Sequence, residues 1–439
     1  MYEQNSTKNI LLINPRWGQE AFFPLELATI CAYLQNNAYR TTSCDMDFDN
    51  IFDNLGQSIT KTYDAVIISV LYHQLPTVKS ICKRLSILNN SIPVIITGNY
   101  TTLFPKEALR DTEANYAILG DAEKTSLNLL NHIFYEMYFP EHVAYFSADG
   151  TFTQNGPAFF DHNLDDLPFA DRKLFPVERY GYAYRSDHYP YAAMKTSRSC
   201  NQNCHFCNIP AYCKDSGFVA RSAKSIVEEM KMLQQFYGVK SIHFEDDAFF
   251  SNLEHVSNLC DEILRQNLDI PWELVNGVRP KEIDLKMLSN LSEAGCKHIC
   301  LGIESLSEQK SNSYYSHTIS EIKKITKQAR KNKIGTTGYF IVGLPNTSYE
   351  ENEYTVLNSK TLGLNMVHFS VYNELPGSIF SETRQSSKIS EEQAAKLASI
   401  GYRKFYISPL QVGKMLMDFG KAPKLIQTVL YKTVARFTS

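Results

Sequence analysis

Short apolar segments alternate with helical patterns in the first third of this chain. Four of these segments contain a continuous apolar run, a fifth (residues 41–47) is more polar, and the stretches between them carry apolar residues at the spacing of a helix. A strand that is apolar on both faces belongs to a parallel sheet that helices cover on both sides. The strands are expected at residues 10–14, 41–47, 65–70, 93–98 and 116–120. Hydrophobic residues make up 44% of the 439-residue chain, which is sufficient for such a core.

The order of these elements predicts a flavodoxin-like (Rossmann-type) α/β domain over residues 1–141. Right-handed crossovers place the loops that follow the strands along one edge of such a sheet, and ligands bind at that edge. Residues 142–188 are expected to be a linker, because residues 165–171 are acidic and contain a proline.

A second series of strands and helices begins near residue 189. It favours a partial (β/α)6 barrel of the TIM type over residues 189–385, rather than a closed eight-stranded barrel. Its strands are expected at residues 193–197, 240–246, 272–279, 298–304, 336–344 and 366–372. The chemistry of such barrels takes place at the carboxyl ends of the strands. Residues 386–439 are expected to form a helical tail in which Phe405 and Tyr406 pack on the barrel.

The strongest chemical signal is a group of three cysteines directly after the first strand of the second series. Cys200, Cys204 and Cys207 have the spacing CxxxCxxC, in a chain with 10 cysteines. Three thiolates on one loop can hold three irons of a [4Fe–4S] cluster and leave the fourth iron open for a substrate or cofactor. A zinc site is the main alternative, with His205 or Cys213 as the fourth ligand that zinc normally requires. A redox disulfide is a weaker alternative.

The balance of charge argues against several classes of partner. The formal net charge is −3, which gives no support for binding to nucleic acid or to a membrane surface. No stretch approaches the roughly 18 uncharged apolar residues of a membrane span, and residues 1–9 carry no apolar signal-peptide core. We therefore expect a cytoplasmic protein without a membrane span and without a nucleic-acid partner.

The cysteine spacing, with Phe206 before the third cysteine, resembles the signature of the radical S-adenosylmethionine (SAM) superfamily. In that family the open iron chelates the amino and carboxyl groups of SAM, and one electron from the cluster cleaves SAM to methionine and a 5′-deoxyadenosyl radical. Gly302 and Glu304 resemble the family's GxES element, which implies that Glu304 contacts the ribose or amino group of SAM. Gly343 and Pro345 resemble its GxP element. The resemblance implies that this element and Phe206 lie near the adenine.

Two further residues at strand ends are candidates for cofactor binding. Asp246 ends the second barrel strand and resembles part of a motif in the cobalamin-binding branch of the superfamily. Its alternative is a carboxylate that caps a helix or stabilises a loop. Arg279 ends the third strand, where a guanidinium can pair with the carboxylate of SAM. Its alternative is an ion pair with a neighbouring acidic side chain.

The N-terminal domain resembles the one that precedes the barrel in cobalamin-binding radical SAM enzymes. Residues expected from this resemblance to contact cobalamin follow the strands or open the first helix: Asn14, Pro24, Ser69, His73, Gly98 and Gly120. Residues 1–165 contain no DxHxxG sequence, from which many cobalamin domains supply a histidine to the cobalt. His73 is the candidate for that position, and a solvated loop histidine is its alternative. Many radical SAM members of the group also lack this sequence, so we still expect cobalamin, and a degenerate domain that no longer binds cobalamin is the alternative.

The resemblance extends over residues 10–410 and implies a [4Fe–4S] cluster, SAM and cobalamin as cofactors. The first hypothesis is methylation of an unactivated carbon, or of phosphorus, in a small-molecule or natural-product substrate, with flavodoxin or ferredoxin as electron donor. A second hypothesis keeps both cofactors but produces an oxidative cyclisation or rearrangement.

Two other functions have less support in the sequence. Methylthiolation of tRNA would require three more N-terminal cysteines for a second cluster. Cys31, Cys44 and Cys82 precede the barrel, but Cys31 and Cys82 fall in helical patterns, away from strand ends. A non-catalytic cobalamin-binding sensor with a structural metal is the alternative from another class, and the GxES and GxP elements argue against it.

Overall fold

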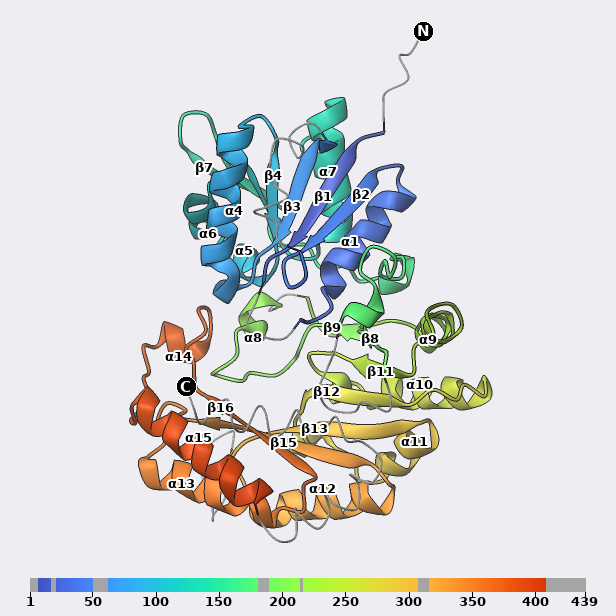
Figure 1. The fold of residues 1–439 in the computed structure, drawn as a ribbon, viewed down its shortest axis with the longest axis vertical. Coiled ribbons are helices and arrows are strands. Elements are labelled where there is room, and N and C mark those ends of the chain that lie inside the picture. The colour runs from blue at the N-terminus through green and yellow to red at the C-terminus, as the bar shows by residue number, and fades with distance from the viewer. Residues whose placement is uncertain are drawn as a thin grey trace. The chain divides into compact units, whose positions relative to one another are not determined.

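Figure 1 shows the computed structural model of the chain, which describes residues 7–16, 21–49, 62–180, 189–213, 216–306 and 316–407. The chain divides into two compact units. Unit 1 comprises Met1–Gly181 and Ala211–Val219, and unit 2 comprises Tyr182–Pro210 and Ala220–Ser439. None of the described helices combines the length and the apolar character needed to cross a membrane.

Unit 1 contains a sheet with the strand order β2-β1-β3-β4-β5-β6-β7. The strands are β1 (Asn9–Asn14), β2 (Arg40–Asp45), β3 (Ala65–Ser69), β4 (Val94–Thr97), β5 (Tyr116–Ile118), β6 (Val143–Phe146) and β7 (Phe152–Asn155). Strands β1 to β5 pair in parallel, with Ile10 opposite Thr41 on one side and Ala65 on the other. The predicted parallel α/β sheet is therefore confirmed.

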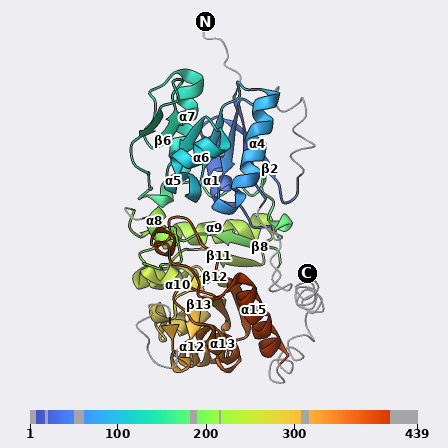
Figure 2. The same cartoon turned by 90° about the vertical axis from the view of Figure 1, so that its left-hand side faces the viewer.

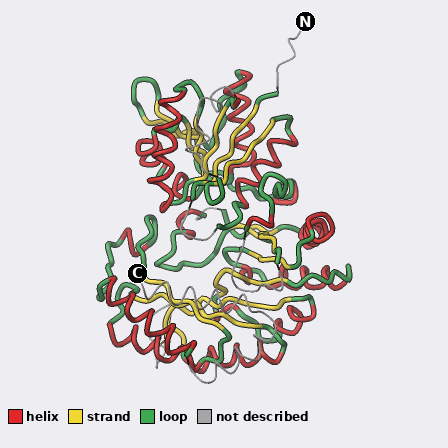
Figure 3. Tube along the Cα trace, viewed as in Figure 1, coloured by secondary structure: helices red, strands yellow, loops and turns green. Residues whose placement is uncertain are grey.

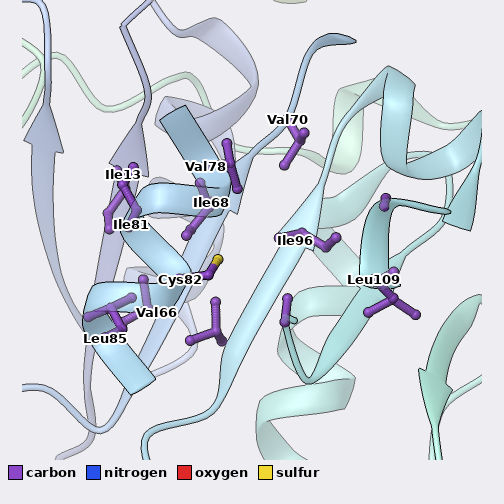
Figure 4. Close-up of a cluster of buried hydrophobic side chains, with 14 of the residues drawn as sticks. Ile13, Val66, Ile68, Val70, Val78, Ile81, Cys82, Leu85, Ile96 and Leu109 are labelled. Atoms are coloured by element: carbon purple, nitrogen blue, oxygen red, sulfur yellow. The ribbon is translucent and has the colours of Figure 1, made fainter. Parts of the chain in front are cut away.

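Helices cover both faces of this sheet, as continuous apolar strands require. They are α1 (Leu25–Asn36), α4 (Leu75–Leu88), α5 (Asn99–Leu103), α6 (Pro105–Thr112) and α7 (Ala122–Tyr135). Helix α1 packs against α7, and α4 packs against α6. Figure 4 shows one resulting core, in which Ile68 and Ile96 of the strands meet Val78, Ile81 and Cys82 of α4.

Strands β6 and β7 lie in the segment for which the sequence analysis expects a linker. They pair antiparallel and extend the sheet beyond β5, with Ala144 opposite Ala117. Val143 and Ala144 are fully buried. Pairing here satisfies backbone groups that β5 would otherwise expose as an edge strand. Each strand has only four residues, so its apolar pattern is too short to identify in the sequence. Residues 181–188 of the expected linker lie outside the described residues.

Unit 2 contains a curved parallel sheet in the order β16-β15-β13-β12-β11-β8, with β14 paired to β13. The strands of unit 2 and its border are β8 (Tyr191–Met194), β9 (Ser197–Arg198), β10 (Val219–Ala220), β11 (Ser241–Phe244), β12 (Trp272–Val278), β13 (Cys296–Leu306), β14 (Ser316–His317), β15 (Gly335–Val342) and β16 (Met366–Val371). This order confirms the partial barrel.

Helices pack on the outer side of the barrel strands (Figures 2 and 3). They are α9 (Ala223–Tyr237), α10 (Leu253–Arg265), α11 (Met287–Glu293), α12 (Ile319–Lys331), α13 (Tyr349–Asn358) and α15 (Glu391–Tyr406). Two short helices, α8 (Ile209–Tyr212) and α14 (Ile379–Glu382), lie outside this layer. Helix α15 packs on β16, α12 on β15 and α13 on β13. The helical tail is thus observed up to α15, and residues 408–439 lie outside the described residues.

Tyrosines of α15 satisfy backbone groups of β16, the last strand of the barrel order. The Tyr406 hydroxyl accepts a hydrogen bond from Val367 N–H and donates one to Val367 C=O, both at 3.1 Å. The Tyr402 hydroxyl accepts from Phe369 N–H at 3.0 Å. An exposed edge strand is a template for unwanted pairing. The two tyrosines, one helical turn apart, therefore close this edge with side chains.

We expect Tyr406→Phe to destabilise the protein by about 1–3 kcal/mol, because both backbone groups of Val367 lose a partner in a half-buried environment. Urea denaturation measures this difference. Tyr138→Phe is the matched control, since Tyr138 is 86% exposed, and it should change stability by less than about 0.5 kcal/mol. Equal effects of the two substitutions would contradict the proposed role of Tyr406.

Candidate functional site

The three cysteines of the CxxxCxxC spacing form a loop after β9 in unit 2. All three are partly exposed, whereas the other free cysteines among the described residues are buried. The loop turns tightly, because Cys207 N–H donates to Cys204 C=O at 3.0 Å. The partial exposure of these three thiols distinguishes them from the buried cysteines, which pack in the core.

Apolar side chains from one other strand end and from a short helix pack on this loop. Leu344, which follows β15, and Phe380, in α14, form a small cluster against which Cys204 and Phe206 pack. The Phe380 ring also lies edge-on to His205, at 5.6 Å between centroids. The predicted neighbourhood of the cysteine loop and the GxP element is therefore present in the fold.

The donor set of the loop fits an iron–sulfur cluster. No group of three or more His, Cys, Asp or Glu side chains is arranged to hold a metal ion in the part of the chain that the structure describes. The assignment of an iron–sulfur cluster therefore depends on the type of ligand, because cysteine thiolates on one short loop are the groups that bind such clusters. Burial raises the pKa of Cys207 to about 12, and coordination by a metal is what deprotonates a thiol of this kind.

A bulge near the end of β13 places Glu304. The pairing of β13 with β15 shifts register between Gly302 and Glu304, and Glu304 has a left-handed φ of 60°. A Cβ on Gly302 would lie 2.8 Å from Glu304 Oε1, so the glycine leaves room for this carboxyl group. A left-handed non-glycine residue costs free energy and often marks a functional site.

The Arg279 guanidinium acts electrostatically on Glu304. Burial raises the pKa of Glu304 to about 8, and the Arg279 guanidinium opposes this shift. Arg279 also donates a hydrogen bond to Gln202 of the cysteine loop. Burial raises the pKa of the Cys204 thiol as well, and Arg279 again lowers it while Glu304 raises it. Arg279 therefore links the cysteine loop electrostatically to Glu304.

The raised pKa of Glu304 predicts a pH-dependent stability. Between pH 4.5 and about 8 the unfolded chain loses this proton while the folded chain retains it, so the stability falls as the pH rises. Glu304→Gln cannot ionise. In the cluster-free protein, its stability relative to wild type should increase between pH 5 and pH 9 by on the order of a few kcal/mol. Urea denaturation at the two pH values measures it, and a constant difference would contradict it.

Backbone packing explains Gly343. Its φ is 88°, and a Cβ there would lie 3.3 Å from Ser387 Oγ and 3.4 Å from Ala394 Cβ. Gly343 N–H donates to Asn352 Oδ1 at 2.7 Å, which fixes the end of β15 to α13. Pro345 is buried in the same turn. The GxP element thus has a structural reason for its glycine and still brings Leu344 to the cysteine loop.

Asp246 is buried, with an exposed fraction of 4%. Its carboxylate accepts hydrogen bonds from Thr196 and Ser197, at the start of the cysteine loop. The next residue, Asp247, is paired with Lys195 at 3.1 Å. The carboxylate predicted to contact a cofactor is therefore engaged with the protein itself.

The candidate residues of unit 1 lie at the carboxyl edge of its sheet or in the turns that follow it. Asn14 ends β1 beside Asp45 of β2, and its side chain hydrogen-bonds to Asp45, whose pKa burial raises. Ser69 ends β3 and is half-buried. Pro24 precedes α1, and its carbonyl accepts from Ala28 N–H at 3.0 Å. These residues share the edge at which open parallel sheets bind ligands.

His73 is exposed in a single 3₁₀ turn (Tyr72–Gln74) directly after β3. Its ring lies 5.3 Å from that of Tyr72, which is also exposed. The imidazole of His73 therefore lies in the turn after β3, where the sequence analysis expects a contact with cobalamin.

Gly98 and Gly120 are fixed by close backbone approach. Gly98 has φ 107°, and a Cβ there would lie 2.9 Å from Val70 C=O. Gly120 has φ 86°, and a Cβ would lie 1.9 Å from Phe159 C=O. Both glycines are therefore required by the packing of unit 1, whether or not a cofactor contacts them.

The structure also identifies two polar groups that the sequence analysis missed. Among the described residues, the buried Oε1 of Glu282 and the buried hydroxyl of Tyr372 have no hydrogen-bond partner. Tyr372 follows β16 and packs in the cluster of Leu344 and Phe380, and the Glu282 charge acts on Cys204. Their positions just after strands are the signal that could have identified them.

Comparisons with known proteins agree with both units. Residues 194–357 match the family model described as the radical SAM superfamily, and residues 20–130 match the B12 binding domain. An uncharacterized methyltransferase of Pyrococcus horikoshii is 24% identical, over 82% of this chain and 84% of the relative. The cytidylyl-2-hydroxyethylphosphonate methyltransferase of Streptomyces wedmorensis is 22% identical, over 86% of this chain and 81% of the relative.

A solved structure supports the fold over most of the chain. The radical S-adenosylmethionine methyltransferase TsrM from Kitasatospora setae, with cobalamin and a [4Fe–4S] cluster bound, superposes with a TM-score of 0.71. It is 18% identical, and the match covers 85% of this chain and 77% of TsrM. The fold of unit 1 and unit 2 is therefore that of a domain pair already seen in a solved protein.

Proposed function

We propose that this chain, which combines a B12-binding domain with a radical SAM domain, is a cobalamin-dependent radical SAM methyltransferase. Its substrate is a small molecule or natural product, methylated at an unactivated carbon or at phosphorus. The observation that carries the proposal is the contact between the partly exposed cysteine loop and Leu344, which follows β15 at the carboxyl ends of the barrel strands. The two methyltransferase relatives support the reaction class.

Each candidate residue has a defined task in this proposal. Cys200, Cys204 and Cys207 bind three irons and leave one iron for the amino and carboxyl groups of SAM. Arg279 pairs with the SAM carboxylate, and Glu304 accepts hydrogen bonds from the ribose or the amino group. When bound, the cluster supplies the electron that cleaves SAM, and cobalamin supplies the methyl group.

The remaining residues shape the binding surfaces. Phe206 and Leu344 pack beside the adenine, next to Cys204. In unit 1 the cobalamin contacts are Asn14, Pro24, Ser69, His73, Gly98 and Gly120. His73 would be the residue that binds the cobalt of cobalamin. A flavodoxin or ferredoxin supplies the electron, the substrate is not a nucleic acid, and the enzyme acts in the cytoplasm.

Labelled SAM tests the reaction. The reconstituted enzyme is incubated with SAM that carries a deuterated methyl group, a strong reductant and the small-molecule fraction of a cell extract. We expect a labelled product, together with equal amounts of 5′-deoxyadenosine and S-adenosylhomocysteine. A product that has lost hydrogen without gaining label would indicate oxidative cyclisation or rearrangement instead. Absence of both 5′-deoxyadenosine and label, as in a Cys207→Ala control, would contradict the proposal.

A further inference from the structure

The Asp246 carboxylate accepts hydrogen bonds from the segment that leads from β8 into the cysteine loop. Its Oδ1 accepts from Thr196 N–H at 3.0 Å, from the Thr196 hydroxyl at 2.7 Å and from the Ser197 hydroxyl at 2.5 Å. Its Oδ2 accepts from Thr196 N–H at 3.1 Å. Cys200 follows Ser197 by three residues. The carboxylate therefore holds the backbone at the point from which the loop departs.

A histidine extends this network on the other side of Thr196. His255 Nε2 lies 3.0 Å from the Thr196 hydroxyl oxygen. The hydroxyl has one proton, which it donates to Asp246, so His255 Nε2–H must be the donor to the hydroxyl. Asn252, the residue before α10, accepts from His255 N–H at 3.1 Å and so fixes the start of that helix.

The carboxylate is not placed to bind a ligand. Asp246, Thr196 and Ser197 are 4%, 0% and 1% exposed. A buried carboxylate needs hydrogen-bond donors, and here the donors come from the protein itself. The loop of the barrel that follows β11 is therefore tied to the one that follows β8, across the paired ends of these two strands, where Phe244 lies opposite Met194.

The backbone beyond the network is bent. Ser199, directly before Cys200, has a left-handed φ of 75° and is 8% exposed. A non-glycine residue in this region is disfavoured by about 1 kcal/mol, so surrounding contacts must hold it there. The hydrogen bonds of Asp246 fix the chain two residues earlier and define the direction in which it turns toward Cys200.

We propose that Asp246, with Thr196, Ser197 and His255, is a positioning network that orders the cysteine loop before the cluster binds, and that Asp246 does not contact SAM. This inference rests on the proposed function for the identity of the ligand, but not for the order of the loop. Replacing a residue that positions metal ligands without binding the metal itself typically changes metal affinity by about 10–100-fold.

Asp246→Asn tests the network, because an amide replaces an acceptor oxygen by a donor that faces the donors of Thr196 and Ser197. In the cluster-free protein, we expect amide hydrogen exchange in a peptide covering residues 195–208 to become at least about tenfold faster. In the reconstituted protein, iron loss to a chelator should accelerate by about tenfold or more, while the dissociation constant of SAM per bound cluster stays unchanged.

Two further variants keep the test decisive. Ser197→Ala removes one hydrogen-bond donor and leaves Asp246 with its bonds from Thr196. It should give a smaller change in the same direction, and it takes the place of Asp246→Asn if that variant does not fold. Glu273→Gln removes another buried carboxylate of the barrel, near the start of β12 and 3% exposed, and should leave exchange of residues 195–208 unchanged.

The opposing results are equally clear. Weaker SAM binding with wild-type exchange and iron retention would make Asp246 a direct SAM ligand and overturn the inference. Unchanged values in all three measurements would also overturn it. If wild type binds no cluster, the proposed function fails, and the exchange measurement alone still decides whether Asp246 orders the loop.

Discussion

Cys204→Ala is expected to purify without the brown colour of an iron–sulfur protein and to retain almost no iron after reconstitution. Cys204 is the central thiol of the loop, and its backbone carbonyl also accepts the hydrogen bond that closes the turn to Cys207. Alanine preserves this turn but removes a ligand, so the cluster loses one of its three protein bonds. Iron and sulfide analysis and the visible spectrum measure the result, and 5′-deoxyadenosine release should fall to background.

Cys213→Ala is the matched control for this experiment. Cys213 lies close in sequence but is 4% exposed and outside the CxxxCxxC spacing. It should retain about four irons per chain, as expected for a [4Fe–4S] cluster. If Cys213→Ala also removes the metal, a four-ligand site of the zinc type would replace the cluster assignment. Full iron and colour in Cys204→Ala would contradict it directly.

Gly120→Ala is expected to destabilise the protein by more than about 3 kcal/mol, because a Cβ would lie 1.9 Å from Phe159 C=O. Relief of this overlap must separate the end of β5 from the segment beside it. Two backbone hydrogen bonds would then break, Phe159 N–H to Leu119 C=O at 3.0 Å and Asp121 N–H to Phe159 C=O at 2.7 Å. Urea denaturation and corrinoid binding by wild type and variant measure the effect.

Gly150→Ala separates the steric overlap from backbone strain. Gly150 has a φ of 81°, close to that of Gly120, but no atom lies within 4 Å of a Cβ placed there. Gly150→Ala should lower the free energy of unfolding by only about 1 kcal/mol, because alanine is disfavoured in the left-handed conformation. Similar destabilisation by the two substitutions would show that Gly120 is selected for its conformation and not for its contact with Phe159.

The elements that the sequence predicts best are those buried on both faces. Strands β1, β3 and β4 consist largely of fully buried residues such as Ile67 and Ile95. Continuous apolar runs of this kind are typical of strands in a parallel sheet that is covered on both faces. Strands β6 and β7 were missed because each has only four residues and neither is buried along its whole length. Tertiary pairing with β5, not local pattern, determines these strands.

In the candidate site, too, some features follow from the local sequence and others only from tertiary packing. The contact of Cys204 and Phe206 with Leu344 could be anticipated, because all three follow strands of one parallel sheet. The engagement of Asp246 could not, since it depends on the register that places Phe244 opposite Met194. A sequence can indicate that a carboxylate lies at a strand end, but it does not show whether that carboxylate binds a backbone amide or a ligand.

The measurement that tests the central claim most directly is the cofactor content of the wild-type protein. The protein is purified without oxygen, reconstituted with iron, sulfide and cobalamin, and separated from unbound cofactors before metal analysis and optical spectroscopy. We predict about four irons and one corrinoid per chain, with 5′-deoxyadenosine released on addition of SAM and a reductant. Bound zinc with neither iron nor corrinoid would contradict the account.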